Sequence, residues 1–156
     1  ISLIVIYLVL SAQFESFIYP LIIIISVPLS LSGGLLGLWF VGSSINIFSQ
    51  IGMIILMGIS AKNGILIVEF ANQLRGVGKT VEDAILKACK QRFRPILMTS
   101  ISTMIGSLPL IFGSGAGSES RLTIGIVVFV GLIVSLILTL FLTPFFYRLI
   151  APYSKK

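Results

Sequence analysis

Long apolar runs alternate along this chain with short polar or glycine-rich stretches. Five runs cover about residues 1–13, 19–41, 46–74, 95–112 and 122–150. A bilayer core of about 30 Å takes about 20 helical residues, and helices satisfy their own backbone groups in lipid. The pattern therefore predicts five membrane-spanning helices. We expect the first to be short because the chain starts directly inside it, without a signal peptide, as in a piece of a longer protein.

Composition agrees with this pattern. Hydrophobic residues make up 56% of the 156 residues and charged residues only 10%. The hydrophobic share is higher and the charged share lower than in soluble domains. We therefore expect an all-α membrane protein. The single cysteine, Cys89, excludes an internal disulfide and is typical of a small buried hydrophobe. Without any histidine the chain offers no His-based proton switch, metal cluster or catalytic triad, and we expect neither metal nor cofactor.

Residues 80–91 predict an amphipathic helix on the cytoplasmic surface, in the basic stretch between the third and fourth runs. Thr80 followed by Asp83 resembles a capping box with aspartate in place of glutamate. Apolar residues then recur at helical spacing, at Val81, Ala84, Ile85, Ala88 and Cys89. We expect a plain connector between two spans, with Pro95 as the first residue of the following helix.

Basic residues are distributed very unevenly between the two predicted sides. One side holds nine of them: Arg75, Lys79, Lys87, Lys90, Arg92, Arg94, Arg148, Lys155 and Lys156. The opposite side holds only Arg121. Cytoplasmic loops carry such an excess, so we expect the basic loop and the C-terminus to be cytoplasmic. Membrane topology thus explains most of the net charge of +6, and we expect no nucleic-acid partner.

Lys62 is the charge that fits this pattern least. It lies inside residues 47–68, a run without any other charge. A lysine at the centre of a spanning helix costs about 2.5–3.5 kcal/mol on insertion scales, so such residues usually have a function and a partner. Glu69 lies seven residues further on nearly the same face, about 10 Å along the axis and too far for a direct ion pair. Asn63 points about 100° away.

No aspartate occurs in any of the five runs, so we expect the partner of Lys62 on a helix outside this chain. A purely structural buried lysine paired with a carboxylate stays open as the alternative. On the fourth run, Arg92, Thr99 and Thr103 share a face that offers donors and acceptors. The alternatives are that Arg92 anchors the helix at the interface and that the threonines are packing positions. Gly33 and Gly37 form a GxxxG pattern, which indicates close helix contact.

Three motifs carry a family resemblance that covers essentially the whole chain. They are GISAKNGILIVEFAN (residues 58–72), RFRPILMTS (92–100) and GSGAGSESR (113–121). In this order and spacing they resemble the resistance-nodulation-division (RND) multidrug efflux pumps, in particular the hydrophobic and amphiphilic drug exporters. The resemblance implies that the five runs correspond to helices eight to twelve of a twelve-helix subunit. The N-terminal half and the periplasmic domains would then lie outside this chain.

The resemblance also implies an activity and its residues. These pumps are homotrimeric drug/proton antiporters of the bacterial inner membrane, secondary active transporters rather than enzymes. They work with a periplasmic adaptor and an outer-membrane channel. In the family the lysine of the AKN motif, here Lys62, faces two adjacent aspartates on the fourth helix. An arginine and a threonine on the eleventh helix complete the proton relay, and they match Arg92 and Thr99. Asn63, Glu69 and Thr103 are then supporting residues.

Two other interpretations remain open at this stage. An exporter of metal ions or lipids from the same superfamily would share these motifs. Metal exporters typically place methionines along their helices, and here only Met53 and Met57 are spaced i, i+4. The other possibility is a non-functional fragment with a structural role in the membrane, since the relay needs the missing half.

Overall fold

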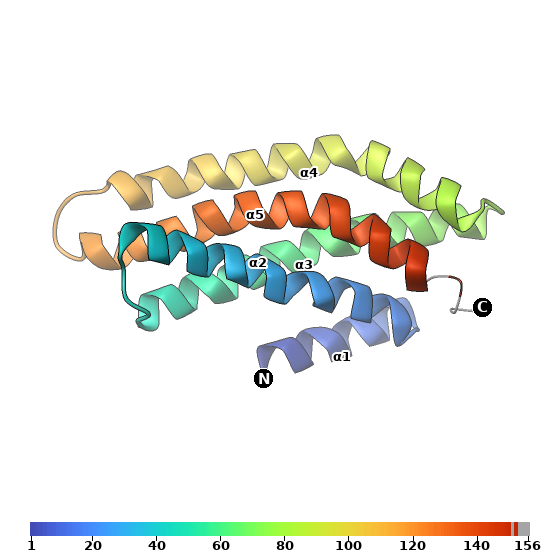
Figure 1. The fold of residues 1–156 in the computed structure, drawn as a ribbon, viewed down its shortest axis with the longest axis horizontal. Coiled ribbons are helices and arrows are strands. Elements are labelled where there is room, and N and C mark those ends of the chain that lie inside the picture. Colours follow the sequence, from blue (N-terminus) through green and yellow to red (C-terminus); the bar gives the residue numbers. More distant parts are fainter. Residues whose placement is uncertain (151, 153–156) are drawn as a thin grey trace.

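The computed structural model describes residues 1–150 and Pro152, and within them all regular structure is helical. Five α-helices follow one another along the chain (Figure 1). They are α1 (Ser2–Phe14), α2 (Ile18–Val41), α3 (Ile47–Gly76), α4 (Val81–Phe112) and α5 (Ser118–Ile150). The predicted all-α fold is confirmed.

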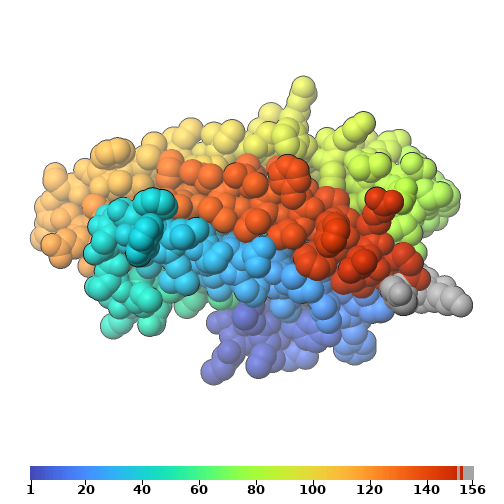
Figure 2. Space-filling model, in the orientation of Figure 1, coloured from blue at the N-terminus to red at the C-terminus, as the bar shows by residue number. Residues whose placement is uncertain are grey.

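Four helices, α2 to α5, are long and apolar enough to cross a membrane. The fifth, α1, is apolar but has only 13 residues. It packs mainly against α2 and lies along one edge of the bundle (Figures 1 and 2). Length and composition together therefore indicate a multi-pass membrane protein.

Helix α5 is the central element of the bundle, because α2, α3 and α4 all pack against it. Figure 2 shows it between α2 and α4 on the face in view. The contact with α2 is very close at the GxxxG glycines. A Cβ atom added at Gly33 would lie 2.5 Å from Cβ of Val134, and one at Gly37 would lie 2.9 Å from Cβ of Val130. The expected close helix contact is confirmed, and its partner is α5.

Helices α3 and α5 run side by side in a fixed register. Four contacts between them join residues 75 positions apart: Gly52 with Val127, Leu56 with Gly131, Ser60 with Ser135, and Asn72 with Tyr147. Both members of each pair advance by four residues or a multiple of four. The two helices thus present their i, i+4 rows to each other over most of their length.

Helix α4 differs from the sequence prediction. A surface helix over residues 80–91 and a span starting at Pro95 were expected, but Val81–Phe112 is one continuous helix with Pro95 inside it. Thr80 caps it as predicted, accepting a 3.3 Å bond from the backbone N–H of Asp83. The apolar face of the first turns does not lie free on a surface, because Ala84 and Ala88 are fully buried in the bundle core. Since both halves of α4 pack on the same core, one proline does not end the helix.

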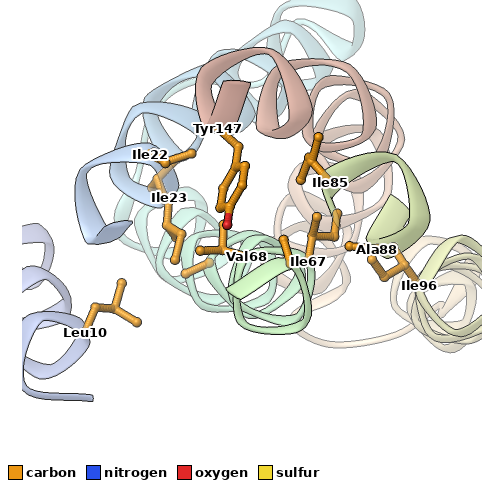
Figure 3. Packing of buried hydrophobic residues seen from close by; sticks show 12 residues of the cluster. Leu10, Ile22, Ile23, Ile67, Val68, Ile85, Ala88, Ile96 and Tyr147 are labelled. Atoms are coloured by element: carbon orange, nitrogen blue, oxygen red, sulfur yellow. The ribbon is translucent and has the colours of Figure 1, made fainter. Parts of the chain in front are cut away.

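The core at this end of the bundle joins residues from all five helices. Tyr147 of α5 is fully buried, between Ile22 and Ile23 of α2 and Val68 of α3, and Ala88 of α4 completes the cluster (Figure 3). Cys89 packs partly buried against the same cluster, as expected for a small hydrophobe.

The loops alternate between the two ends of the bundle, as a series of spans requires (Figure 1). At one end the first turn of α4 meets the end of α5 through an ion pair of Glu82 with Arg148. At the other end Ser43 contacts Thr123 at 3.4 Å. The end with the ion pair also holds Arg75, Lys79, Lys87 and Lys90. Lys155 and Lys156, counted on the same side from the sequence, lie outside the described residues.

Candidate functional site

Lys62 lies in the middle of α3 on an exposed stripe. Asn46 starts this helix with a reciprocal capping box, exchanging 2.9 Å bonds with Ser49. The exposed stripe then follows helical spacing through Gly58, Lys62 and Glu69. Among residues 1–150, no hydrogen bond or ion pair involves the Lys62 ammonium. Its charge therefore points away from the part of the bundle that this chain builds.

Asn63 points into the bundle instead. It is only 3% exposed, and the nitrogen of its amide, Nδ2, is buried without a hydrogen-bond partner among the described residues. The roughly 100° step between neighbouring helix positions explains how one residue faces outward and the next inward. The predicted divergence of Lys62 and Asn63 is therefore present in the structure.

Arg92 joins α4 to α3. Its guanidinium carbon lies 4.9 Å from the ring centre of Phe70, a distance suited to a cation–π interaction. The side chain is half-buried, and its Nε has no acceptor within the described part of the chain. Arg92 is thus packed against a neighbouring helix rather than free at a surface.

The contact of Arg92 with Phe70 sets the relative depth in the bundle of the other two predicted relay residues, Lys62 and Thr99. Lys62 precedes Phe70 by eight residues, and Thr99 follows Arg92 by seven. At 1.5 Å per residue both lie about 10–12 Å from the contact, and because α3 and α4 are antiparallel they lie in the same direction from it. Lys62 and Thr99 are therefore at a similar depth on adjacent helices, and both are exposed.

The hydroxyls on α4 currently bond to their own helix. Thr99 Oγ1 lies 3.1 Å from the carbonyl oxygens of both Pro95 and Ile96 and donates to them, and Thr103 Oγ1 donates to the Thr99 carbonyl at 2.8 Å. Each hydroxyl oxygen still has lone pairs with which to accept a bond from a cation.

Glu69 stands apart from Lys62, as their spacing predicted. It lines a pocket of about 720 Å³ at the end of the bundle, formed by the α1–α2 turn and the last turns of α3. Arg75 lines the same pocket but donates instead to the hydroxyl of Tyr19, at 2.7 Å. The structure therefore does not bring Glu69 together with the three predicted relay residues.

A polar cluster at this same end was not expected from the sequence. Tyr147 donates a 2.6 Å bond to Oδ1 of Asn72, and its ring stacks on Tyr19 with centroids 6.0 Å apart. Together with the Arg75–Tyr19 bond this links α2, α3 and α5. Its members are scattered over three helices, so no local spacing could have indicated it.

Lys79, in the turn between α3 and α4, lies close to Lys87 near the start of α4. Lys87 lowers the pKa of Lys79, first as a hydrogen-bonding neighbour and then, after desolvation, as a like charge, while Asp83 acts in the opposite direction. Lys79 and Lys87 thus concentrate positive charge at the end of the bundle that the sequence assigns to the cytoplasm.

The fold and the motifs define a multi-pass membrane transporter of the RND class. A model of the AcrB/AcrD/AcrF family matches residues 1–151, and the chain belongs to this family. The resemblance drawn from the three sequence motifs is thereby confirmed.

Two relatives show how this chain relates to longer proteins. It is 44% identical to a protein from Haemophilus influenzae described as an uncharacterized transporter, over 99% of this chain and 16% of the relative. It is also similar to a solved structure of a heavy metal efflux pump, with a TM-score of 0.85 and 31% identity over 96% of this chain and 15% of that one. The chain therefore spans about a sixth of the length of each relative.

Proposed function

We propose that this chain is part of a proton-coupled efflux transporter and carries the cationic side of its proton relay. The observation that carries the proposal is the position of Lys62. It lies halfway along a helix long enough to span the membrane, is exposed, and has no ion-pair partner among residues 1–150. A charge at this depth is costly unless a protein group outside the described bundle pairs with it.

Arg92 and Thr99 complete the relay in this proposal. The similar depth of Lys62 and Thr99, set by the stacking of Arg92 on Phe70, supports it. With partner carboxylates ionised, charge pairing holds Lys62 in place. A proton that neutralises a carboxylate releases the ammonium, and the hydroxyl oxygen of Thr99 then accepts a bond from it. Asn63, Glu69 and Thr103 support the site.

The electrical driving force is large enough for such a switch. Moving one charge across a membrane is worth about 2.3 kcal/mol per 100 mV. A change of charge next to Lys62 would bias two alternative packings of the helices, and this bias would be transmitted to the rest of the subunit. The carboxylates would be the aspartate pair that the family resemblance implies on another helix of the same subunit.

The assembly follows from the family. We infer a homotrimer in the bacterial inner membrane, working with a periplasmic adaptor and an outer-membrane channel, with the C-terminus in the cytoplasm. The gathering of Arg75, Lys79, Lys87 and Lys90 at one end of the bundle supports this orientation.

For the substrate, we propose hydrophobic and amphiphilic compounds, on the basis of the motifs. Export of metal ions is the second candidate, and it is favoured by the similarity to the heavy metal efflux pump. The methionines give this candidate little support: Met57 and Met104 pack against the two apolar clusters of the bundle. Lipid export remains a third option within the same superfamily.

One experiment tests the relay and the substrate together. The full-length transporter and its Lys62→Met variant are expressed in a host that lacks its own efflux pumps. Export is then measured for an amphiphilic dye and for divalent metal ions. We expect dye export by the parent protein and none by Lys62→Met, with unchanged expression and assembly.

Lys90→Met is the matched control, because Lys90 is an equally exposed lysine at the end of the bundle and should retain export. If the parent protein exports metal ions but not dye, the substrate class is metal ions rather than amphiphilic compounds. Undiminished export of every substrate by Lys62→Met would rule out the relay role.

A further inference from the structure

Two buried polar side chains with unsatisfied atoms belong to α3 and α5, which pack against each other. Asn63 is 3% exposed and Thr139 is 1% exposed, and neither Asn63 Nδ2 nor Thr139 Oγ1 has a hydrogen-bond partner among the described residues. A buried polar atom without a partner is expensive, and native proteins usually satisfy such atoms with ordered water. Both residues are buried by other residues of this chain, so we look for the missing hydrogen-bond partners inside the bundle.

The register of the two helices brings these atoms to the same level. Ser135 Oγ donates a 2.9 Å bond to Ser60 Oγ, and this bond joins α3 to α5. Asn63 lies three residues beyond Ser60, a rise of about 4.5 Å, and Thr139 lies four residues beyond Ser135, a rise of about 6 Å. Since the two helices are parallel, both residues lie about one turn further along their helices, at a similar level.

The residue directly opposite Thr139 in this register is Gly64, 75 positions earlier. Gly64 has no side chain, so Thr139 alone supplies one at this level of the row, as Val127 does opposite Gly52. A Cβ added at Gly64 would first meet Ile23 of α2, at 3.4 Å, and no atom of Thr139 is among its nearest neighbours. The space beside Gly64 is thus bordered by Ile23 of α2, and α3 places no side chain of its own directly opposite Thr139.

We propose that a buried water molecule binds between α3 and α5 and bridges Asn63 to Thr139. The water accepts a bond from Asn63 Nδ2 and donates one to Thr139 Oγ1. Ser60 accepts the bond from Ser135 and retains its own hydroxyl proton, so it can supply a further donor to the water. A buried water typically makes about three hydrogen bonds, which matches this set.

This site has a consequence for Lys62, which rests on the role proposed for it above. Anchoring Asn63 to α5 fixes the rotation of α3 about its own axis at this level. Lys62 is the preceding residue, so its outward direction is fixed with it. Asn63 would then act as a positioning residue for Lys62.

The direct test is a structure of the full-length transporter at a resolution that shows ordered water. We expect a density peak within hydrogen-bond distance of both Asn63 and Thr139. A direct bond between the two side chains, or the absence of a peak beside them, would overturn the proposal. This result does not depend on transport, so it stands or fails separately from the relay.

Thermal unfolding of the full-length protein supplies an independent check. Thr139→Val and Asn63→Leu should each lower Tm. The double variant should lower Tm by less than the sum of the two single losses, because either change alone already removes one partner of the shared water. Additive losses would contradict the bridge. Thr139→Ser keeps the hydroxyl and should retain both the density peak and most of the Tm.

A matched control is Ser30→Ala. The Ser30 hydroxyl is fully buried but bonds within its own helix, to the Val27 carbonyl at 2.7 Å. Its loss should therefore be additive with Thr139→Val. Coupling of the same size in this control would show that the effect is not specific to a shared water.

Discussion

The contact between α2 and α5 and the outer face of α3 and α4 have opposite characters. The α2–α5 contact is built from glycines against valines, and it approaches so closely that even one methyl group would not fit at Gly33. The outer face presents an unpaired lysine, a half-buried arginine, and the exposed Thr99 next to the half-buried Thr103. One region is complete within residues 1–150, whereas the other has donors without matching acceptors.

The comparison separates the residues that stabilise the bundle from those that we propose to act in transport. In lipid no hydrophobic force drives helices together, so association depends on close packing and on interhelical hydrogen bonds. The glycine contact supplies the first and the Ser60–Ser135 bond an example of the second. On the outer face Arg92 packs against Phe70, but the Lys62 ammonium makes no bond to the described part of the bundle. We therefore propose that Lys62 serves function rather than stability.

The largest effect on stability is expected at the glycine contact. Gly33→Ala would place its Cβ 2.5 Å from Val134, so the helices must separate, at a cost of about 1–3 kcal/mol. Gly106→Ala is the matched control: the same change in α4 meets no atom within 4 Å of the new Cβ in this chain. Thermal unfolding of the full-length protein should show a clear fall in Tm for Gly33→Ala and none for Gly106→Ala. Equal Tm values for the two variants would show that the glycine contact does not hold α2 and α5 together.

Next in size is Tyr147→Phe. This change leaves Oδ1 of Asn72 without its 2.6 Å bond in a part-buried region and should cost about 1 kcal/mol. Tyr7→Phe serves as the control, because the Tyr7 hydroxyl makes only an exposed bond of 3.3 Å to the Phe17 carbonyl. A Tm equally unaffected in both variants would show that the polar cluster does not stabilise the bundle.

Arg92 combines a packing contact with a proposed role in the relay, so its substitution tests whether the two roles can be separated. Arg92→Lys keeps the charge but loses the flat guanidinium over Phe70, worth about 0.5–2 kcal/mol. We expect a modest fall in Tm and a reduced transport rate. If transport falls and Tm does not, Arg92 acts in the relay alone, and the stacking does not set the register of α3 and α4.

The smallest effect is expected for the ion pair of Glu82 with Arg148 at the end of the bundle. Both side chains are more than half exposed, and such pairs contribute about 0–1 kcal/mol. Glu82→Gln should therefore leave Tm nearly unchanged, and any small loss should fade with added salt. A loss as large as that of Gly33→Ala would mean that this ion pair closes the bundle.

Most of the helices could be predicted from the sequence because spanning segments of this kind must be helical. The boundaries of α2, α3 and α5 fall within a few residues of the apolar runs. The continuity of α4 could not be predicted: Pro95 suggests a helix start by local rules, and only the shared core contact of Ala88 and Ile96 carries the helix through it.

The site could be predicted only as far as single residues. A lone charge in an apolar run singles out Lys62, and the motifs add Arg92 and Thr99. Their relative depth depends on the contact of Arg92 with Phe70, which involves two helices and no sequence period. The cluster of Tyr19, Asn72 and Tyr147 escaped detection for the same reason.

The central claim is that Lys62 couples transport to proton movement. The most direct measurement is proton flux in vesicles containing the full-length transporter, recorded while substrate is added, for the parent protein, Lys62→Met and the control Lys90→Met. We expect substrate-dependent proton flux in the parent and in Lys90→Met and none in Lys62→Met. Undiminished proton flux in Lys62→Met would contradict the account.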